Sequence, residues 1–494
     1  MKRYLIIMMM LAACQLSFSK DYYVATDGDD SNDGSIESPL QKLSTAIGKA
    51  TAGTTIYLRE GCYRPQVSDI MAVKGESNVY DCVYMLKKNG NADNPITITG
   101  YEDESVTIDL SDIKTDNRII GFDLKGNYWH LKNFDIVGIQ VTQTGHTQSI
   151  NVALFGGSNC VVEQVNMHDG MGIGVYATRG SNNLVLNCDA YNNYDPVSEN
   201  GKGGNCDGFG FHFNKAEYTG NVVRGCRAWR NSDDGFDLIN NWAPVTIENC
   251  WAWQNGYDAN MVSRGDGTGI KSGGYGMSAS PKVPTVIPRN IIRNCIAWAN
   301  KNQGFYANHH LGGLDFMNNS AYKNRRNFNM VNRKSAAEAV DVPGYEHRLL
   351  NNVAFSPTEK GSDCININLD LSTLANNTFY GTITVGTSDF ESLDTSELLL
   401  PRRADGSLPE ISFMKLKESS DAYKAGMGWQ FDAPGSASVN SPYCDREIAA
   451  DEQVTIYRTD GVPVYTGVYG EATLPHGLYL IRSQSGTSSK IYNR

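Results

Sequence analysis

The 494-residue sequence predicts an all-β fold, a parallel β-helix followed by a small C-terminal β-domain. The first observation is a repeated block, Asn/Gly-Cys-x-Ala-aromatic, whose cysteine stands at positions 188, 226, 250 and 295. The second is a set of glycine-led strands beside it, and the third is an excess of glycine, 49 residues, which tight turns require. The shortest cysteine interval, 24 residues from Cys226 to Cys250, suits one coil of short strands and turns.

The glycine-led strands predict which side chains face into the coils. Side chains alternate between the two faces of a strand, so aligning the glycines gives one inward and one outward column. The inward, apolar column is Phe209, Phe236, Ile270 and Phe305. The outward column, expected to point to solvent, is Gly210, Asp237, Lys271 and Tyr306.

Polar residues of the repeat have structural interpretations of their own. A cysteine at one fixed place in each repeat predicts a buried ladder of small side chains rather than disulfides. The asparagines after each strand predict turn residues that hydrogen-bond one another between coils. No Cys-x-x-Cys or Cys/His cluster has the spacing of a zinc site.

Residues 1–19 predict an export signal. A basic start, Met1–Arg3, precedes an apolar run, Tyr4–Ala13, that is too short to span a bilayer. Leu11-Ala12-Ala13-Cys14 resembles a bacterial lipobox, which would place a lipid anchor on Cys14; the other interpretation is cleavage before Lys20. We expect a secreted, periplasmic or cell-surface protein that contacts membrane only through such an anchor. Export would also allow a disulfide between Cys62 and Cys82.

The remaining chain divides into a β-helical catalytic domain, 20–440, and a small C-terminal domain, 441–494. Residues 39–52 predict an amphipathic helix that covers the first coil, because an open end of a solenoid would expose apolar edges. Residues 401–409 predict an extended segment over the coils. Short strands from Val454 onward predict a β-sandwich, which resembles the sorting tails of secreted Bacteroidetes proteins.

The charge balance limits the partners. Lys and Arg total 43 and Asp and Glu total 54, a net charge of −11. This argues against nucleic acid or an anionic membrane surface, since both need a basic face. A polyanionic substrate requires local cations, and we expect the protein to act on it as a monomer.

Four aspartates predict a cation site. Asp207 and Asp234 lie 27 residues apart, about one coil, with Asp233 and Asp237 beside them. Neighbouring coils are about 4.8 Å apart, so these carboxylates would repel one another unless protonated or bound to a cation. Oxygen-only ligands in an irregular set favour Ca²⁺. The alternative is a group of solvated turn residues.

Lys271 stands one coil beyond Asp237 and predicts a general base. A nearby divalent cation disfavours the ammonium form, and a neutral lysine accepts protons. Insertions at 194–205 and 257–268 should wall a cleft over the aspartates, with Lys202 and Arg264 as candidate contacts to an anionic substrate and Tyr306 as a further contact. This set suits β-elimination from a uronic acid polymer, in which Ca²⁺ stabilises charge on the substrate carboxylate and the base removes the C5 proton.

At these residues the sequence resembles polysaccharide lyase family nine, the pectate-lyase-like right-handed β-helix enzymes. The resemblance covers about Asp21 to Gly435 and is sharpest at three segments, 205–209, 232–237 and 266–274. It implies Ca²⁺ binding by Asp207, Asp233, Asp234 and Asp237 and a base role for Lys271. It also implies a pectic substrate, either homogalacturonan or rhamnogalacturonan I.

Two other functions remain open at this stage. An inverting glycoside hydrolase of the polygalacturonase type would use the same aspartates as acid and base, although Gly269-Ile270-Lys271 lacks the arginine of that family's Arg-x-Lys. A non-catalytic glycan-binding β-helix would use them as structural ligands. The lyase alone predicts an unsaturated product and an alkaline optimum.

Overall fold

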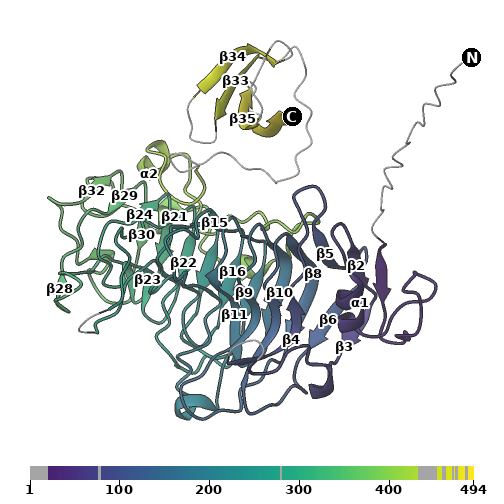
Figure 1. Cartoon of the computed structure of the whole chain (residues 1–494). Helices are drawn as coiled ribbons and strands as arrows, with labels where there is room; N and C mark the ends of the chain where they lie inside the picture. Colours follow the sequence, from purple (N-terminus) through teal and green to yellow (C-terminus); the bar gives the residue numbers. More distant parts are fainter. Residues whose placement is uncertain are drawn as a thin grey trace, which may run out of the picture. The chain divides into compact units, whose positions relative to one another are not determined.

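Short strands, each hydrogen-bonded to its counterpart one coil further along the chain, build the larger part of this protein (Figure 1). The structure is a computed structural model that describes residues 20–75, 79–278, 281–431, 453–458, 463–469, 472, 477–483 and 488–493. The chain divides into two units between Phe431 and Asp432. The predicted export signal, 1–19, and its lipobox at Cys14 lie outside the described residues. None of the helices in the described part has the length and apolar character needed to span a bilayer.

The largest sheet has 20 parallel strands arranged in two rows. The first row is β1 (Tyr22–Val24), β2 (Thr55–Leu58), β5 (Ile96–Gly100), β8 (Trp129–Val137), β10 (Val161–His168), β12 (Leu184–Leu186), β15 (Asn221–Arg224), β18 (Val245–Glu248), β21 (Ile291–Arg293), β24 (Asp315–Met317), β29 (Arg348–Leu350) and β32 (Thr373–Ala375). The long strands β8 and β10 also belong to the second row, whose other members are β3 (Gly61–Tyr63), β6 (Val106–Asp109), β13 (Asp189–Tyr191), β16 (Arg227–Trp229), β19 (Trp251–Trp253), β22 (Ile296–Trp298), β25 (Ser320–Tyr322) and β30 (Val353–Phe355).

A second parallel sheet of ten strands completes the coils and carries the candidate site. Its strands are β4 (Tyr80–Leu86), β7 (Arg118–Leu124), β9 (Ser149–Phe155), β11 (Gly172–Arg179), β14 (Phe209–Phe211), β17 (Phe236–Asp237), β20 (Ile270–Lys271), β23 (Gln303–Tyr306), β26 (Arg326–Asn329) and β31 (Cys364–Ile365). One coil therefore reads β15, β16, β17, and the next reads β18, β19, β20. The predicted parallel β-helix is confirmed.

The predicted register of the second sheet is also confirmed. Phe209 pairs with Phe236, then with Ile270 and Phe305 along the stack. These four side chains are fully buried in the core. Burying an aromatic or aliphatic side chain of this size contributes about 1.5–3 kcal/mol, so the inward column is a main source of stability.

The outward column differs from the prediction in its exposure. Gly210, Asp237, Lys271 and Tyr306 pair in register as expected, but Asp237 and Lys271 are only 5% and 8% exposed. The expectation that they point freely to solvent is therefore wrong. Asp237 and Lys271, one strand spacing apart, form an ion pair in which each side chain shields the other from solvent.

The cysteine and asparagine ladders form as predicted. Cys188, Cys226, Cys250 and Cys295 are free and fully buried. Asparagine side chains donate in series from coil to coil, over distances of 2.9–3.2 Å, through Asn193, Asn231, Asn255, Asn300 and Asn324. The disulfide between Cys62 and Cys82 that the sequence allows is not formed, since the Cys62 thiol is exposed and free.

The helix at the N-terminal end is α1 (Leu43–Lys49), which is shorter than the predicted 39–52. Its C-cap, Ala50, is already extended and leads the chain into β2. Leu43, Ala46 and Ile47 are buried against the first coil, so the helix covers that end as expected. The other helical segments are η1 (Val67–Asp69), η2 (Ser198–Gly201), η3 (Thr387–Asp389), η4 (Thr395–Leu399) and α2 (Asp421–Lys424).

Two smaller sheets accompany the coils. The hairpin of β27 (Asn332–Arg333) and β28 (Asp341–Val342) is antiparallel and projects from the turn after β26. The C-terminal unit holds β33 (Gln453–Arg458), β34 (Pro463–Val468), β35 (Gly477–Ser483) and β36 (Ser488–Asn493) in an antiparallel sheet of order β34-β33-β35-β36. The described part of the C-terminal unit is thus one antiparallel sheet, built from the short strands that the sequence predicts, and it includes no second layer of a sandwich.

The predicted extended segment at 401–409 does lie over the coils. Arg402 pairs with Asp189 and donates to the Cys188 carbonyl at 3.2 Å, while Arg227 of β16 pairs with the same aspartate and donates to the Leu400 carbonyl at 2.9 Å. Asp189 is 5% exposed. One buried carboxylate therefore joins two neighbouring coils to the segment that covers them.

Asp189→Asn should destabilise the β-helix by about 3–5 kcal/mol, because it leaves two largely buried guanidinium groups without their anion. The free energy of unfolding in urea measures the effect. The matched control is Arg403→Ala, which removes the exposed pair of Arg403 with Glu410 and should change stability by less than about 1 kcal/mol. Equal losses in the two variants would contradict this role for Asp189.

Candidate active site

Three aspartates converge on the outer face of the ten-stranded sheet. Each of Asp207, Asp234 and Asp237 offers a carboxylate oxygen, and these oxygens all lie within 4.8 Å of one another. All three side chains are buried. Asp207 and Asp234 occupy matching positions before the strand glycines of successive coils, and Asp237 belongs to β17. The stacking of coils, rather than a local loop, brings the three carboxylates together.

Backbone amides fix the orientation of each carboxylate. The Asp207 Oδ1 accepts from the Asp234 amide at 3.2 Å, and the Asp234 Oδ1 accepts from the Thr268 amide at 2.6 Å. The Asp237 Oδ1 accepts from the Ile239 amide at 2.7 Å. One oxygen of each carboxylate is therefore held by the main chain.

Lys271 contacts the other carboxylate oxygen of Asp234 and of Asp237. Its Nζ forms an ion pair with the Asp234 Oδ2 and lies 3.3 Å from the Asp237 Oδ2. The His212 Nε2 is 3.7 Å from that same Asp237 oxygen. The amine and three of the four predicted carboxylates thus share one buried cluster.

Most of the pKa values in this cluster are shifted in the directions expected for an excess of negative charge. Burial lowers the pKa of Lys271, but the surrounding carboxylates outweigh burial and raise it well above its ordinary value. Burial, together with neighbouring carboxylates, raises the pKa of Asp207 well above normal and that of Asp234 to about 6. Burial also acts to raise the pKa of Asp237, but Lys271 and His212 hold it below its ordinary value. The ammonium group neutralises the cluster only in part.

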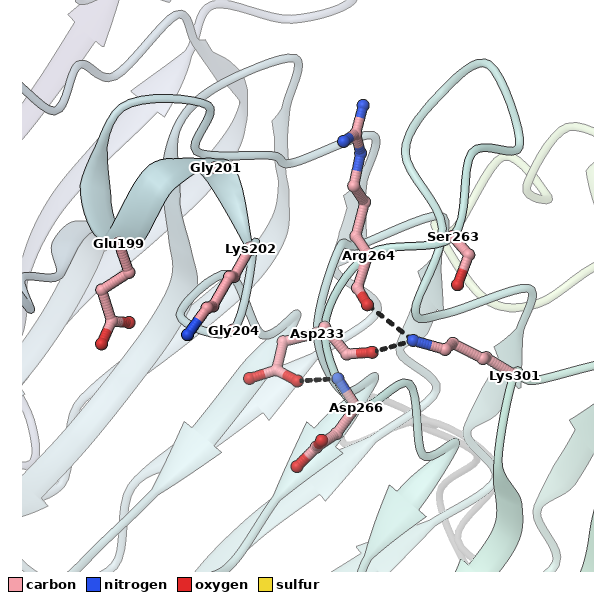
Figure 2. A pocket seen from close by; sticks show the side chains of 10 residues that line it. Glu199, Gly201, Lys202, Gly204, Asp233, Ser263, Arg264, Asp266 and Lys301 are labelled. Carbon is pink, nitrogen blue, oxygen red and sulfur yellow. Dashed lines mark hydrogen bonds between the residues drawn. The ribbon is translucent and has the colours of Figure 1, made fainter.

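Asp233 is set apart from the other three aspartates. It is not in the group whose oxygens all lie within 4.8 Å, and its Oδ1 accepts instead from the Asp266 amide at 2.8 Å. It lines the neighbouring pocket (Figure 2). Burial and the charge of Asp234 raise its pKa well above normal, so it remains coupled to the cluster.

Both insertions line a pocket of about 470 Å³, in which Asp233 is the one lining residue from the four predicted aspartates. The first insertion contributes Glu199, Gly201, Lys202 and Gly204, and the second contributes Ser263 to Asp266. The loops approach closely at Gly265, where a Cβ atom would lie 2.8 Å from the Gly203 carbonyl oxygen. The Lys301 Nζ donates to the Arg264 and Gly265 carbonyls at 2.6 and 2.5 Å and supports the second wall (Figure 2).

The three predicted substrate contacts have different settings. Lys202 is exposed and lines the pocket. Arg264 also lines it, but its guanidinium makes two hydrogen bonds to Asp258 and lies 4.3 Å from the centre of the Tyr194 ring. Figure 2 shows this side chain directed away from Asp233. Tyr306 is not among the pocket's lining residues; it stands one strand beyond Lys271 in the outward column.

Sequence reasoning missed His212 and the residues around Tyr306. His212 could have been found, because it lies two residues beyond Gly210 and shares its outward parity. Its Nδ1 is 3.0 Å from the Tyr176 hydroxyl, and Tyr176 leans over Gly210, where a Cβ atom would be 2.8 Å from its ring. No sequence signal marks His309 or Asp341, which reach Tyr306 through a turn and a hairpin.

The donor set fits a hard divalent cation. It consists of carboxylate oxygens alone, the buried group carries more negative than positive charge, and the backbone already fixes one oxygen of each carboxylate. These properties match Ca²⁺ better than a thiolate- or imidazole-seeking metal.

Comparison with known proteins identifies the family. Residues 22–352 match the family model of the Pel9A-like, right-handed β-helix region. The chain belongs to this family. It is 33% identical over 417 residues to pectate lyase L of Dickeya chrysanthemi, covering 83% of this chain and 87% of that protein.

Two solved structures share the fold over most of the chain. A rhamnogalacturonan lyase is 42% identical with a TM-score of 0.79, over 83% of this chain and all of that one. Pectate lyase Pel9A is 30% identical with a TM-score of 0.63, over 81% and 90% of the two chains. The predicted right-handed pectate-lyase-like helix is therefore confirmed, and this protein is a polysaccharide lyase.

The family assignment removes the two other functions that the sequence left open. The geometry of the aspartates also argues against the hydrolase. An inverting glycosidase separates its two carboxyl groups by about 6.5–9.5 Å to admit water. The oxygens of Asp207, Asp234 and Asp237 lie within 4.8 Å of one another, which suits shared cation binding instead.

Proposed function

We propose that the protein is a calcium-dependent lyase that cleaves a galacturonic-acid-containing pectic backbone by β-elimination, with Lys271 as the general base. The observation that carries this proposal is the contact of the Lys271 amine with the Oδ2 atoms of Asp234 and Asp237. This contact places the candidate base beside the candidate cation site. Elimination needs both, the cation to stabilise charge on the substrate carboxylate and the base to remove the C5 proton.

Asp207, Asp234 and Asp237 would hold the Ca²⁺, and Asp233 would complete the set from the pocket side. The bound cation would act as a Lewis acid on the substrate carboxylate, which gains charge when the C5 proton leaves. Binding of the cation would neutralise the carboxylates of Asp234 and Asp237 that now pair with the Lys271 amine.

Lys271 must lose a proton before it can act. In the cation-free protein the carboxylates hold its pKa well above normal, so the amine is charged and cannot accept the C5 proton. Once those carboxylates are neutralised, the free amine removes the C5 proton, the C4–C5 double bond forms and the C4–O4 bond breaks. No water adds to the sugar.

Substrate binding is assigned to the two walls of the pocket. Lys202 would pair with a carboxylate of the polymer, because it is exposed there. Arg264 would contribute mainly by holding the second wall through Asp258 and Tyr194. Tyr306 would contact the sugar next to the scissile bond.

Rhamnogalacturonan I is the favoured polymer and homogalacturonan the second candidate. Identity to the rhamnogalacturonan lyase is 42%, compared with 30% and 33% for the two pectate lyases, and the match covers the whole of the rhamnogalacturonan lyase chain. We also propose that the enzyme is exported and acts as a monomer on this polymer.

The test is incubation with each polymer, with and without EDTA, while following ultraviolet absorbance of unsaturated ends. We expect absorbance to rise faster on rhamnogalacturonan I, to stop with EDTA and to return with added Ca²⁺ but less with Mg²⁺. New reducing ends without absorbance would indicate hydrolysis and overturn the proposal, as would full activity in EDTA.

A further inference from the structure

A chain of three polar side chains continues the outward column beyond Lys271, and the base reaction does not use it. Tyr306 pairs with Lys271 in the register of β20 and β23. The Tyr306 hydroxyl lies 3.0 Å from the His309 Nε2, and the His309 Nδ1 lies 2.8 Å from the Asp341 Oδ1. The three residues thus form a Tyr–His–Asp relay next to the proposed base, with a close contact rather than an aligned hydrogen bond between His309 and Asp341.

The turn that carries His309 has a left-handed backbone. Asn308 and His309 both have positive φ, +55° and +56°, a conformation that non-glycine residues adopt at a cost of about 1–3 kcal/mol. Asp341 arrives from β28, in the hairpin that projects after β26. The side chain of His309 is 18% exposed and that of Asp341 is 58% exposed. The relay therefore leads from the half-buried Tyr306 of the outward column to the exposed Asp341.

The ionisation of Tyr306 suits a proton donor. Burial, with a contribution from Asp341, raises the pKa of Tyr306 to about 12. The hydroxyl consequently keeps its proton under alkaline conditions in which a lysine base is neutral. A hydroxyl both donates and accepts, so Tyr306 can donate to a bound sugar while accepting from His309.

We propose that Tyr306 is the general acid of the elimination, which protonates the leaving O4, and that His309 and Asp341 are positioning residues that return its proton. This inference rests on the proposed function, since it assigns the second proton of the same reaction.

The proton balance is complete. Lys271 takes the C5 proton, the electron pair forms the C4–C5 double bond, and the C4–O4 bond breaks. O4 takes the Tyr306 proton, the phenolate regains one from the His309 Nε2, and His309 takes a replacement from solvent beside Asp341. The Lys271 ammonium releases the C5 proton to solvent, which restores the base.

Stereochemistry places a requirement on the bound sugar. In a galacturonate, H5 and O4 leave from opposite faces of the ring, so the acid and base must flank it. Lys271 and Tyr306 rise from neighbouring strands about 4.8 Å apart, so the two side chains would have to diverge around the ring, with the amine on its H5 face and the hydroxyl on its O4 face.

The test compares two substrates, the natural polymer and an oligosaccharide whose reactive galacturonate carries a 4-nitrophenyl group on O4, a leaving group that needs no proton. On the polymer, Tyr306→Phe should lower kcat about 10²–10³-fold with KM within about threefold. His309→Gln and Asp341→Asn should lower kcat less, by about 10-fold and about threefold. On the activated substrate all three variants should match the parent enzyme within about threefold.

Tyr380→Phe is the matched control, because it removes a tyrosine hydroxyl that donates to the Cys364 carbonyl away from this column, and it should retain full activity on both substrates. Equal losses of Tyr306→Phe on both substrates, a rise in KM with unchanged kcat, or no loss would each overturn the inference. Lys271→Ala, run in parallel, separates the two proposals. If it keeps activity on either substrate, the proposed function fails; if it loses both while Tyr306→Phe does not discriminate, only the acid assignment fails.

Discussion

Lys271→Ala should abolish elimination, with kcat at least about 10³-fold lower, because no other amine contacts both the Asp234 and the Asp237 Oδ2 atoms in the described cluster. Release of unsaturated ends measures the loss at saturating substrate and Ca²⁺. In the parent enzyme the rate should rise toward alkaline pH, since the neutral fraction of an amine grows as pH rises.

Lys271→Arg separates the base from the buried charge. Arginine keeps a cation on the carboxylates but does not deprotonate, so this variant should be as inactive as Lys271→Ala while it keeps more of the parent's thermal stability in EDTA. Lys424→Ala, which removes an exposed lysine paired with Asp421, is the control with full activity. An active Lys271→Arg enzyme would show that Lys271 is not the base.

Asp234→Asn should raise the Ca²⁺ concentration for half-maximal activity by at least about tenfold and lower the rate at any subsaturating concentration. The amide oxygen can still accept from Thr268, so the change removes charge without removing that bond. Calcium should also raise Tm less in the variant than in the parent, because weaker binding gives less stabilisation.

The stability of the same variant in EDTA has a predictable sign. A carboxyl whose folded pKa is raised to about 6 binds protons more readily in the folded chain, so its contribution to stability falls as pH rises from its unfolded value through 6. Above that pH, Asp234→Asn should be at least as stable as the parent. Asp421→Asn, at an exposed site, should change neither calcium dependence nor Tm. A variant with unchanged calcium dependence would exclude Asp234 as a ligand.

Repetition made much of this fold predictable from sequence. Glycines before Phe209, Phe236 and Ile270 set the register, and alternation then placed Asp237 next to Lys271. The backbone ladder enforces both rules, so a single alignment of repeats fixes many contacts at once.

Side-chain choices within that frame were less predictable. Asp233 and Asp234 are adjacent in sequence, yet a bond from the Asp266 amide holds Asp233 toward the pocket. Arg264 was expected to face substrate, but Asp258 lies in the same insertion and engages it. These outcomes depend on loop conformation, and the repeat carries no information about loops. The position of Asp341 beside His309 was unpredictable for the same reason, because Asp341 comes from a hairpin between coils.

The outward column also determines how the enzyme can be dissected. Each coil contributes one position, in the order Tyr176, Gly210, Asp237, Lys271 and Tyr306, and main-chain hydrogen bonds alone set the interval between them. Replacing one side chain should therefore leave the other four anchor points where they are. Combined substitutions can then be analysed as thermodynamic cycles along a line, with coupling expected to fade beyond the nearest neighbour.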